Sequence, residues 1–152
     1  MRFHPGPEPL PERAAEPPAW RWLLIASALV AIGCSVTPWV CVQFSRLWGA
    51  HSGPPGWQSS AGFTCFFSCA LLVMLTLVET EAVTTQHAVR PGSLLLAALT
   101  TLVVTFEWWD GPGQLRGVSA TWTAWFYAVL VCMPFLLFAC SRRWLFISNR
   151  RG

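Results

Sequence analysis

The chain has 152 residues, of which 54% are hydrophobic and only 11% charged, and its formal net charge is +3. Soluble domains carry about 25% charged residues, and a soluble core of this size could not hide so much apolar surface. The composition therefore excludes an ordinary soluble protein. The small positive charge does not indicate nucleic-acid binding either, because the arginines that carry it lie at the ends of apolar segments and in the tails.

Proline and glutamate dominate residues 1–19. Six prolines alternate there with three glutamates and few apolar side chains. Such a segment cannot bury enough apolar area to fold. We predict a disordered, proline-rich cytoplasmic tail.

Four apolar stretches follow, and each comes close to the about 20 residues that cross a bilayer as a helix. They predict transmembrane helices over about 20–40, 61–78, 93–108 and 119–140. A Gly/Pro-rich loop, a polar link ending at Pro91-Gly92 and an Asp110-Gly111-Pro112-Gly113 turn separate them. The predicted fold class is all-α: a polytopic four-transmembrane-helix bundle with short loops, followed by a basic cytoplasmic tail over 142–152.

Arginine distribution predicts the orientation. Eight arginines fall on the side of the two termini, and only Arg46 and Arg116 fall on the other side. Cytoplasmic loops carry the excess of basic residues. We therefore expect a multi-pass protein of the cell membrane with both termini cytoplasmic.

Small residues at four-residue spacing form a stripe on each predicted helix. Residues four apart share a helix face, and small side chains let helices approach closely in lipid. The stripes predict a compact bundle, with Val104 facing lipid instead. The predicted packing residues are Ser27, Ala31, Ser35, Ala97, Thr101, Ala124 and Ala128.

Tryptophans concentrate on the predicted outer side. An interfacial anchoring belt explains most of the ten. Seven on one side is more than anchoring needs, so a partner could dock there. The candidate partner-binding residues are Trp57, Glu107, Trp108, Trp109 and Asp110. Glu107 and Asp110 could alternatively serve as an acid/base pair, or they simply end a hydrophobic span at the water boundary.

The six cysteines have no metal-site spacing. They are small packing residues in apolar helices, or Cys41 and Cys65 pair as an outer disulfide. The Ala31-Ile32-Gly33-Cys34 run resembles a lipidation motif, but the leading region is acidic and the apolar run continues past Cys34. We expect no cofactor, no metal site and no catalytic constellation.

Three functions remain open. The leading one is a non-enzymatic structural or accessory protein that binds another membrane protein, or itself, through helix faces or the outer face. The second is an oligomeric small-molecule transporter or channel subunit, with a lumen lined by Thr100, Thr101 and Thr105. The third is a membrane-embedded enzyme that uses the outer acidic residues Glu107 and Asp110, with His51 as the only histidine expected on the same outer face.

The chain resembles small four-helix inner-membrane proteins of GC-rich, actinobacterial-type bacteria. The resemblance rests on Thr37-Pro38-Trp39-Val40, on Gly56-Trp57 at the end of the first outer loop, and on a C-terminus whose basic residues are all arginine. It implies the fold and no activity. Leu47-Trp48 and Trp57 also resemble the first outer loop of claudins, but Gly49 follows Trp48 and no spaced cysteine pair lies within the loop.

Overall fold

The structure is a computed structural model that describes residues 18–44, 49–79, 83–113 and 118–148. Four α-helices make up most of it: α1 (Pro18–Ser35), α2 (Ser60–Val78), α3 (Val83–Asp110) and α4 (Ala124–Ser148). Three strands, β1 (Val40–Phe44), β2 (Ala50–Ser52) and β3 (Val118–Trp122), and a 3₁₀ turn η1 (Gly56–Gln58) complete the described part.

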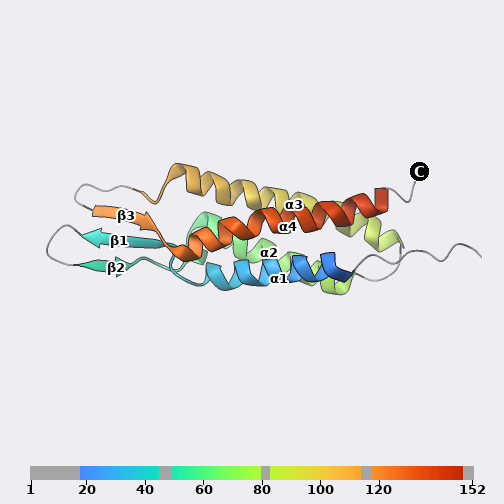
Figure 1. The fold of residues 1–152 in the computed structure, drawn as a ribbon, viewed down its shortest axis with the longest axis horizontal. Coiled ribbons are helices and arrows are strands. Elements are labelled where there is room, and N and C mark those ends of the chain that lie inside the picture. The colour runs from blue at the N-terminus through green and yellow to red at the C-terminus, as the bar shows by residue number, and fades with distance from the viewer. Residues whose placement is uncertain (1–17, 45–48, 80–82, 114–117, 149–152) are drawn as a thin grey trace, which may run out of the picture.

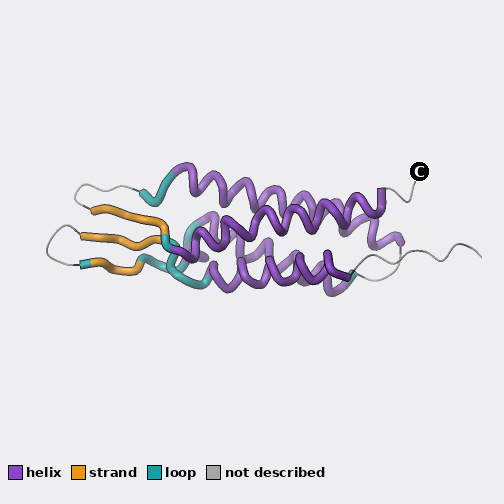
Figure 2. The backbone as a smooth tube through the Cα atoms, viewed as in Figure 1, coloured by secondary structure: helices purple, strands orange, loops and turns teal. Residues whose placement is uncertain are grey.

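The helices lie side by side along the long axis of the molecule (Figure 1). α1 packs against α2 and α4, and α3 packs against the same two helices. The strands project beyond one end of the bundle, which we call the sheet end (Figure 2). The beginning of α1 and the end of α4 lie at the opposite end (Figure 1). We call it the arginine end, because Arg21 in α1, Arg90 in α3, and Arg142 and Arg143 in α4 lie there.

Three helical segments are long and apolar enough to cross a membrane: Ser60–Val78, Val89–Asp110 and Ala124–Leu145, of 19, 22 and 22 residues. These lengths correspond to about 28–33 Å, which matches the about 30 Å hydrocarbon core of a bilayer. The apolar part of α1, Ala19–Ser35, is shorter. α1 nevertheless lies alongside the other three.

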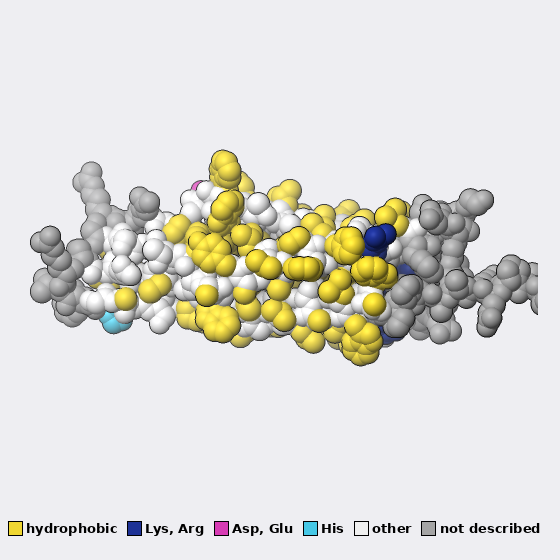
Figure 3. Space-filling model, in the orientation of Figure 1, with side chains coloured by type: hydrophobic (Ala, Val, Ile, Leu, Met, Phe, Trp, Pro, Cys, Tyr) yellow, Lys and Arg dark blue, Asp and Glu magenta, His cyan; other side chains and the backbone are white. Residues whose placement is uncertain are grey.

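Large apolar side chains cover the outside of the helices (Figure 3). Leu95, Leu102 and Phe106 on α3 are each 66–70% exposed, and Val131 on α4 is 59% exposed. Water would oppose so much contiguous exposed apolar surface, whereas lipid would solvate it. The middle of the bundle therefore has the surface of a membrane-embedded protein.

The core follows a seven-residue spacing rather than the predicted four-residue one. On α4 a row of buried residues alternates steps of three and four: Phe126, Val129, Met133, Leu136 and Cys140, with Ala139 buried beside it. On α3, Ala97, Thr100 and Val104 are fully buried. Such an average period of 3.5 keeps one seam facing the neighbouring helix, whereas a strict four-residue stripe rotates away from it.

The predicted stripes therefore stay in the core only over short distances. Of the predicted packing residues, Ser27, Ala31, Ser35 and Ala97 are buried, Thr101 and Ala128 are half-buried, and Ala124 is exposed at the start of α4. The expectation that Val104 faces lipid is wrong, because this side chain is fully buried. Drift of the i+4 row around the helix explains both differences.

Hydroxyl groups in the helices bond within their own helix. Ser35 Oγ donates to the carbonyl oxygen of Ala31 at 2.8 Å, and Thr101 Oγ1 donates to that of Ala97 at 2.8 Å. Thr100 Oγ1 donates in the same way to the carbonyl of Leu96. These hydroxyls are satisfied within their own helix, and their small side chains allow the neighbouring helices to approach closely.

The sheet corrects the all-α prediction. The first helix ends at Ser35 rather than Val40, and residues Val40–Phe44 form the central strand β1. The fourth helix begins at Ala124 rather than Ser119, and Val118–Trp122 form β3. Both segments alternate apolar and polar residues, which favours a strand over a helix. The sheet order is β2-β1-β3, and all its pairs are antiparallel.

At the arginine end the helices are longer than predicted. α3 begins at Val83 and continues through Pro91-Gly92, which was expected to break the chain. α4 continues through Arg142 and Arg143 to Ser148, where a tail was expected. The predicted disordered segment 1–19 lies almost entirely outside the described residues.

Candidate binding surface at the sheet end

Trp39 attaches the sheet to the bundle. Its side chain is only 2% exposed, and its indole Nε1–H donates to the carbonyl oxygen of Cys34 at 3.0 Å. Its ring meets that of Phe126 edge-on, with centroids 5.2 Å apart, while Trp122 stacks on Phe126 at 4.1 Å. Three aromatic rings from α4, β3 and the segment before β1 thus form the floor of the sheet. Trp39 was expected in an interfacial belt, and its burial was not predicted.

Hydrogen bonds fix the same junction. The backbone N–H of Thr123 donates to the carbonyl of Trp39 at 2.8 Å, and its Oγ1 donates to the carbonyl of Pro38 at 2.7 Å. On the other side of β1, Gly53 N–H donates to the carbonyl of Val40 at 2.8 Å. Because both outer connections are tied to the exit of α1, the sheet is a rigid extension of the bundle.

The two faces of the sheet differ in chemistry. Cross-strand partners project from the same face and alternate residues from opposite faces. The register pairs Val40 with Trp122, Val42 with Ala120 and Phe44 with Val118, so these six residues form one face, which we call the apolar face. His51 pairs with Val42 and joins this face, where its ring lies 6.1 Å from that of Phe44. The polar face comprises Cys41, Gln43, Ala50, Ser52, Ser119 and Thr121.

The apolar face is incompletely covered. Toward the bundle, Val40 and Trp122 pack on the core. Farther out, Val42, Val118 and Ala120 are half-buried and Phe44 is 41% exposed. A sheet that is apolar on one face normally packs that face against another element. The outer half of this face is therefore a candidate contact surface.

The edge strand β3 is also open. Among the described residues it pairs with β1 alone. Its sequence, Val-Ser-Ala-Thr-Trp, contains neither proline nor charge, the two features that most often protect an edge strand. The free edge could accept a further strand, and that strand would widen the apolar face.

The predicted partner-binding residues lie near this end of the molecule, but on two separate elements, η1 and the end of α3. Trp57 lies in η1 and is 43% exposed; Trp108 and Trp109 end α3 and are 43% and 82% exposed. Glu107 is half-buried and Asp110 is exposed. In the described part of the chain neither carboxylate makes a side-chain hydrogen bond or an ion pair.

Cysteines and other potential ligands form no built site in the described residues. All six cysteines are free; Cys41 lies on β1, and Cys65 is buried in α2. No group of three or more His, Cys, Asp or Glu side chains is placed to hold a metal ion in the described ranges. The threonines proposed to line a lumen do not share an environment, since Thr100 is fully buried and Thr105 is exposed.

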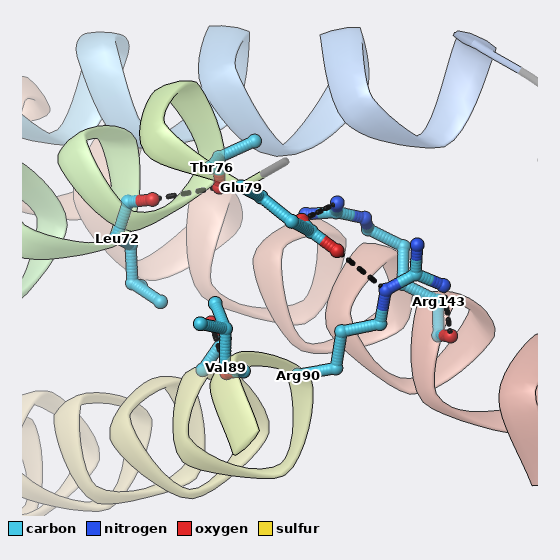
Figure 4. Close-up of polar contacts among 7 residues, drawn as sticks. Leu72, Thr76, Glu79, Val89, Arg90 and Arg143 are labelled. Atoms are coloured by element: carbon cyan, nitrogen blue, oxygen red, sulfur yellow. Dashed lines mark hydrogen bonds and ion pairs between the residues drawn. The ribbon is translucent and has the colours of Figure 1, made fainter. Parts of the chain in front are cut away.

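A buried ion cluster lies at the arginine end, where the sequence suggested only a solvated polar link (Figure 4). Glu79 follows the last turn of α2. One of its carboxylate oxygens accepts from Arg90 Nε at 2.7 Å, and the other accepts from Arg143 Nη2. Arg90 also donates to the carbonyl oxygen of Arg143 at 3.1 Å. The three side chains are only 5–6% exposed, so α2, α3 and α4 meet in one desolvated triad.

Comparison with protein-family models, with curated proteins and with solved structures finds no match to this chain.

Proposed function

We propose that this protein is a non-enzymatic accessory protein of the cell membrane, with four membrane-spanning helices and both termini in the cytoplasm. Three long apolar helices support the membrane setting. α1, which packs against α2 and α4, supplies the fourth span with the mostly apolar segment Ala19–Ser35, whose length is near the lower limit of about 17 residues for a crossing. The eight-to-two arginine bias assigns the arginine end to the cytoplasm and the sheet end to the outside.

In this proposal the outer sheet is the part of the molecule that binds the partner. One observation carries this proposal: an amphipathic sheet, held rigidly by Trp39 and Thr123, presents an apolar face whose outer half is open. We propose that the outer segment of another membrane protein docks on this apolar face and covers Val118, Ala120 and Phe44. An apolar segment fits because Val118, Ala120 and Phe44 are apolar, and His51 is the one titratable side chain among the described residues of this face.

Alternating residues of β3 provide the test. Ala120→Lys puts a charge on the apolar face, where a docked partner would leave it desolvated and unpaired. Thr121→Lys puts the same charge on the exposed polar face of the same strand. We expect Ala120→Lys to lower partner recovery at least tenfold, and Thr121→Lys to change it less than twofold. The assay is quantitative co-purification after crosslinking in native membranes.

A photoreactive residue identifies the side of contact directly. Placed at position 118, on the apolar face, it should crosslink to a second membrane protein, whereas at position 119, on the polar face, it should not. Equal crosslinking from both positions, or equal loss of recovery in both lysine variants, contradicts docking on the apolar face. Tryptophans at the ends of η1 and α3 would then act only as membrane anchors.

A further inference from the structure

At the arginine end, one arginine lies on aromatic rings instead of against a carboxylate. The guanidinium carbon of Arg142 is 5.7 Å from the centre of the Trp20 ring and 5.2 Å from that of Phe138. The two rings meet edge-on with centroids 5.5 Å apart, and they join α1 to α4. We call these three residues the arginine corner.

Cation–π contact with the two rings holds the guanidinium there. Such contact does not use the N–H donors of the group in an ion pair, so they remain able to bind an acceptor. In the described residues no carboxylate forms an ion pair with Arg142, whose side chain is exposed. Arg143, its neighbour in sequence, is by contrast buried against Glu79. Arg142 thus has a charge and a donor fork available for an acceptor from outside the chain.

The surface below the corner indicates what that acceptor is attached to. Val131, Phe135 and Phe138 are exposed by 59%, 51% and 45%. They precede Arg142 by eleven, seven and four positions, which places all four side chains along one face of α4. An apolar strip of about 16 Å therefore runs from the middle of the helix to a cationic head.

We propose that the arginine corner binds the headgroup of an anionic phospholipid, with one acyl chain along Val131, Phe135 and Phe138. A phosphodiester has the two oxygens that a guanidinium fork binds best. The apolar strip commits the site to a lipid rather than to free phosphate, which would leave the strip unused. The cytoplasmic leaflet is rich in anionic lipids that attract arginines at helix ends. This inference rests on the membrane setting of the helices and not on docking at the sheet end.

The test compares two exposed arginines at the same end. The full-length protein in non-ionic detergent is titrated with dioleoyl phosphatidylglycerol or with dioleoyl phosphatidylcholine, and bound lipid is counted by native mass spectrometry. Arg142→Gln should lower the preference for phosphatidylglycerol about fivefold, the effect of one arginine near a charged leaflet. Arg21→Gln removes the same charge from an exposed position that makes no cation–π contact with the described aromatic residues, so it should change the preference less than twofold.

Two further arms complete the experiment. Arg142→Lys keeps the charge without the fork and should retain an intermediate preference; it also serves if Arg142→Gln fails to fold. sn-Glycerol 3-phosphate at millimolar concentration should not displace the lipid. Equal losses in Arg142→Gln and Arg21→Gln would mean a diffuse surface potential and overturn the site. Displacement by glycerol phosphate would overturn the assignment to a lipid.

Discussion

Replacing Glu79 by glutamine should lower the free energy of unfolding by about 3–5 kcal/mol, the usual cost of removing one partner from a buried ion pair. Glutamine keeps the size of the side chain but removes the charge that binds Arg90 Nε and Arg143 Nη2, in a site where the side chains are only 5–6% exposed. Three helices meet at this carboxylate. Chemical or thermal unfolding of the protein in detergent micelles measures the loss.

Glu107 provides the matched control. It is the same residue type in an apolar helix, but it is half-buried and forms no ion pair in the described part of the chain. Glu107→Gln should change the unfolding free energy by less than about 0.5 kcal/mol, as for most substitutions away from a buried network. If the two variants unfold alike, the triad contributes nothing to the contact of α2, α3 and α4.

Gly62→Ala should be the most damaging small substitution at the sheet end. A methyl group at position 62, in the first turn of α2, would overlap the carbonyl oxygen of Gly56 in η1. The atoms that the methyl group would meet, in Gly56 and Trp57, all belong to the backbone, so no side-chain rotation can relieve the overlap. Gly56 in turn packs on the Trp39 ring, and its backbone N–H donates to the carbonyl oxygen of Thr37 at 2.8 Å. We expect the shift to cost about 2–3 kcal/mol, within the range for overpacked sites, measured by the same unfolding assay.

The corresponding change in α1 should have the opposite sign. Gly33 is also helical, but nothing lies within 4 Å of the position that a β-carbon would take. Gly33→Ala should stabilise the protein by about 0.5–1 kcal/mol, because alanine loses less backbone entropy in a helix. Destabilisation of both variants to the same degree would show that the tight contact between η1 and α2 is not what Gly62 provides.

The helices could be predicted because hydropathy over about 20 residues is a strong local signal. α2 is the clearest case, since its span of Ser60–Val78 differs from the predicted 61–78 by one residue. The core seam was only partly predictable. Four-residue spacing identified Ala31 and Ala97, yet it placed Val104 in lipid, because a row at i+4 leaves the buried seam after two or three steps.

The sheet was missed although its signal is present. Val40-Cys41-Val42-Gln43-Phe44 and Val118-Ser119-Ala120-Thr121-Trp122 both alternate apolar and polar residues. Each run adjoins a hydrophobic helix, so a hydropathy window absorbs it into the helix. Its pairing joins two segments more than 70 positions apart, and no local pattern specifies such a contact. The apolar face follows from this register and was therefore beyond sequence reasoning.

The buried triad was missed for a related reason. Glu79, Arg90 and Arg143 each lie at the boundary of an apolar segment, where charges ordinarily mark the water interface. Only the packing of three helices brings them together. Arg142 and Arg143 illustrate the difference, because two adjacent arginines with identical local signals lie in opposite environments, one exposed on aromatic rings and one buried beside Glu79.

The proposed four membrane-spanning helices would carry the sheet outside. Labelling with a membrane-impermeant maleimide tests this topology, in a variant whose six native cysteines are replaced by alanine and whose unfolding profile is unchanged. Ser52→Cys, on the exposed strand β2, should be labelled in intact cells, whereas Ala14→Cys, before α1, and Gly152→Cys, after α4, should be labelled only after the membrane is opened. Labelling of Ala14→Cys and Ser52→Cys from the same side would mean that α1 does not cross, and labelling of Gly152→Cys in intact cells would place the C-terminus outside; either result contradicts four crossings with both termini in the cytoplasm.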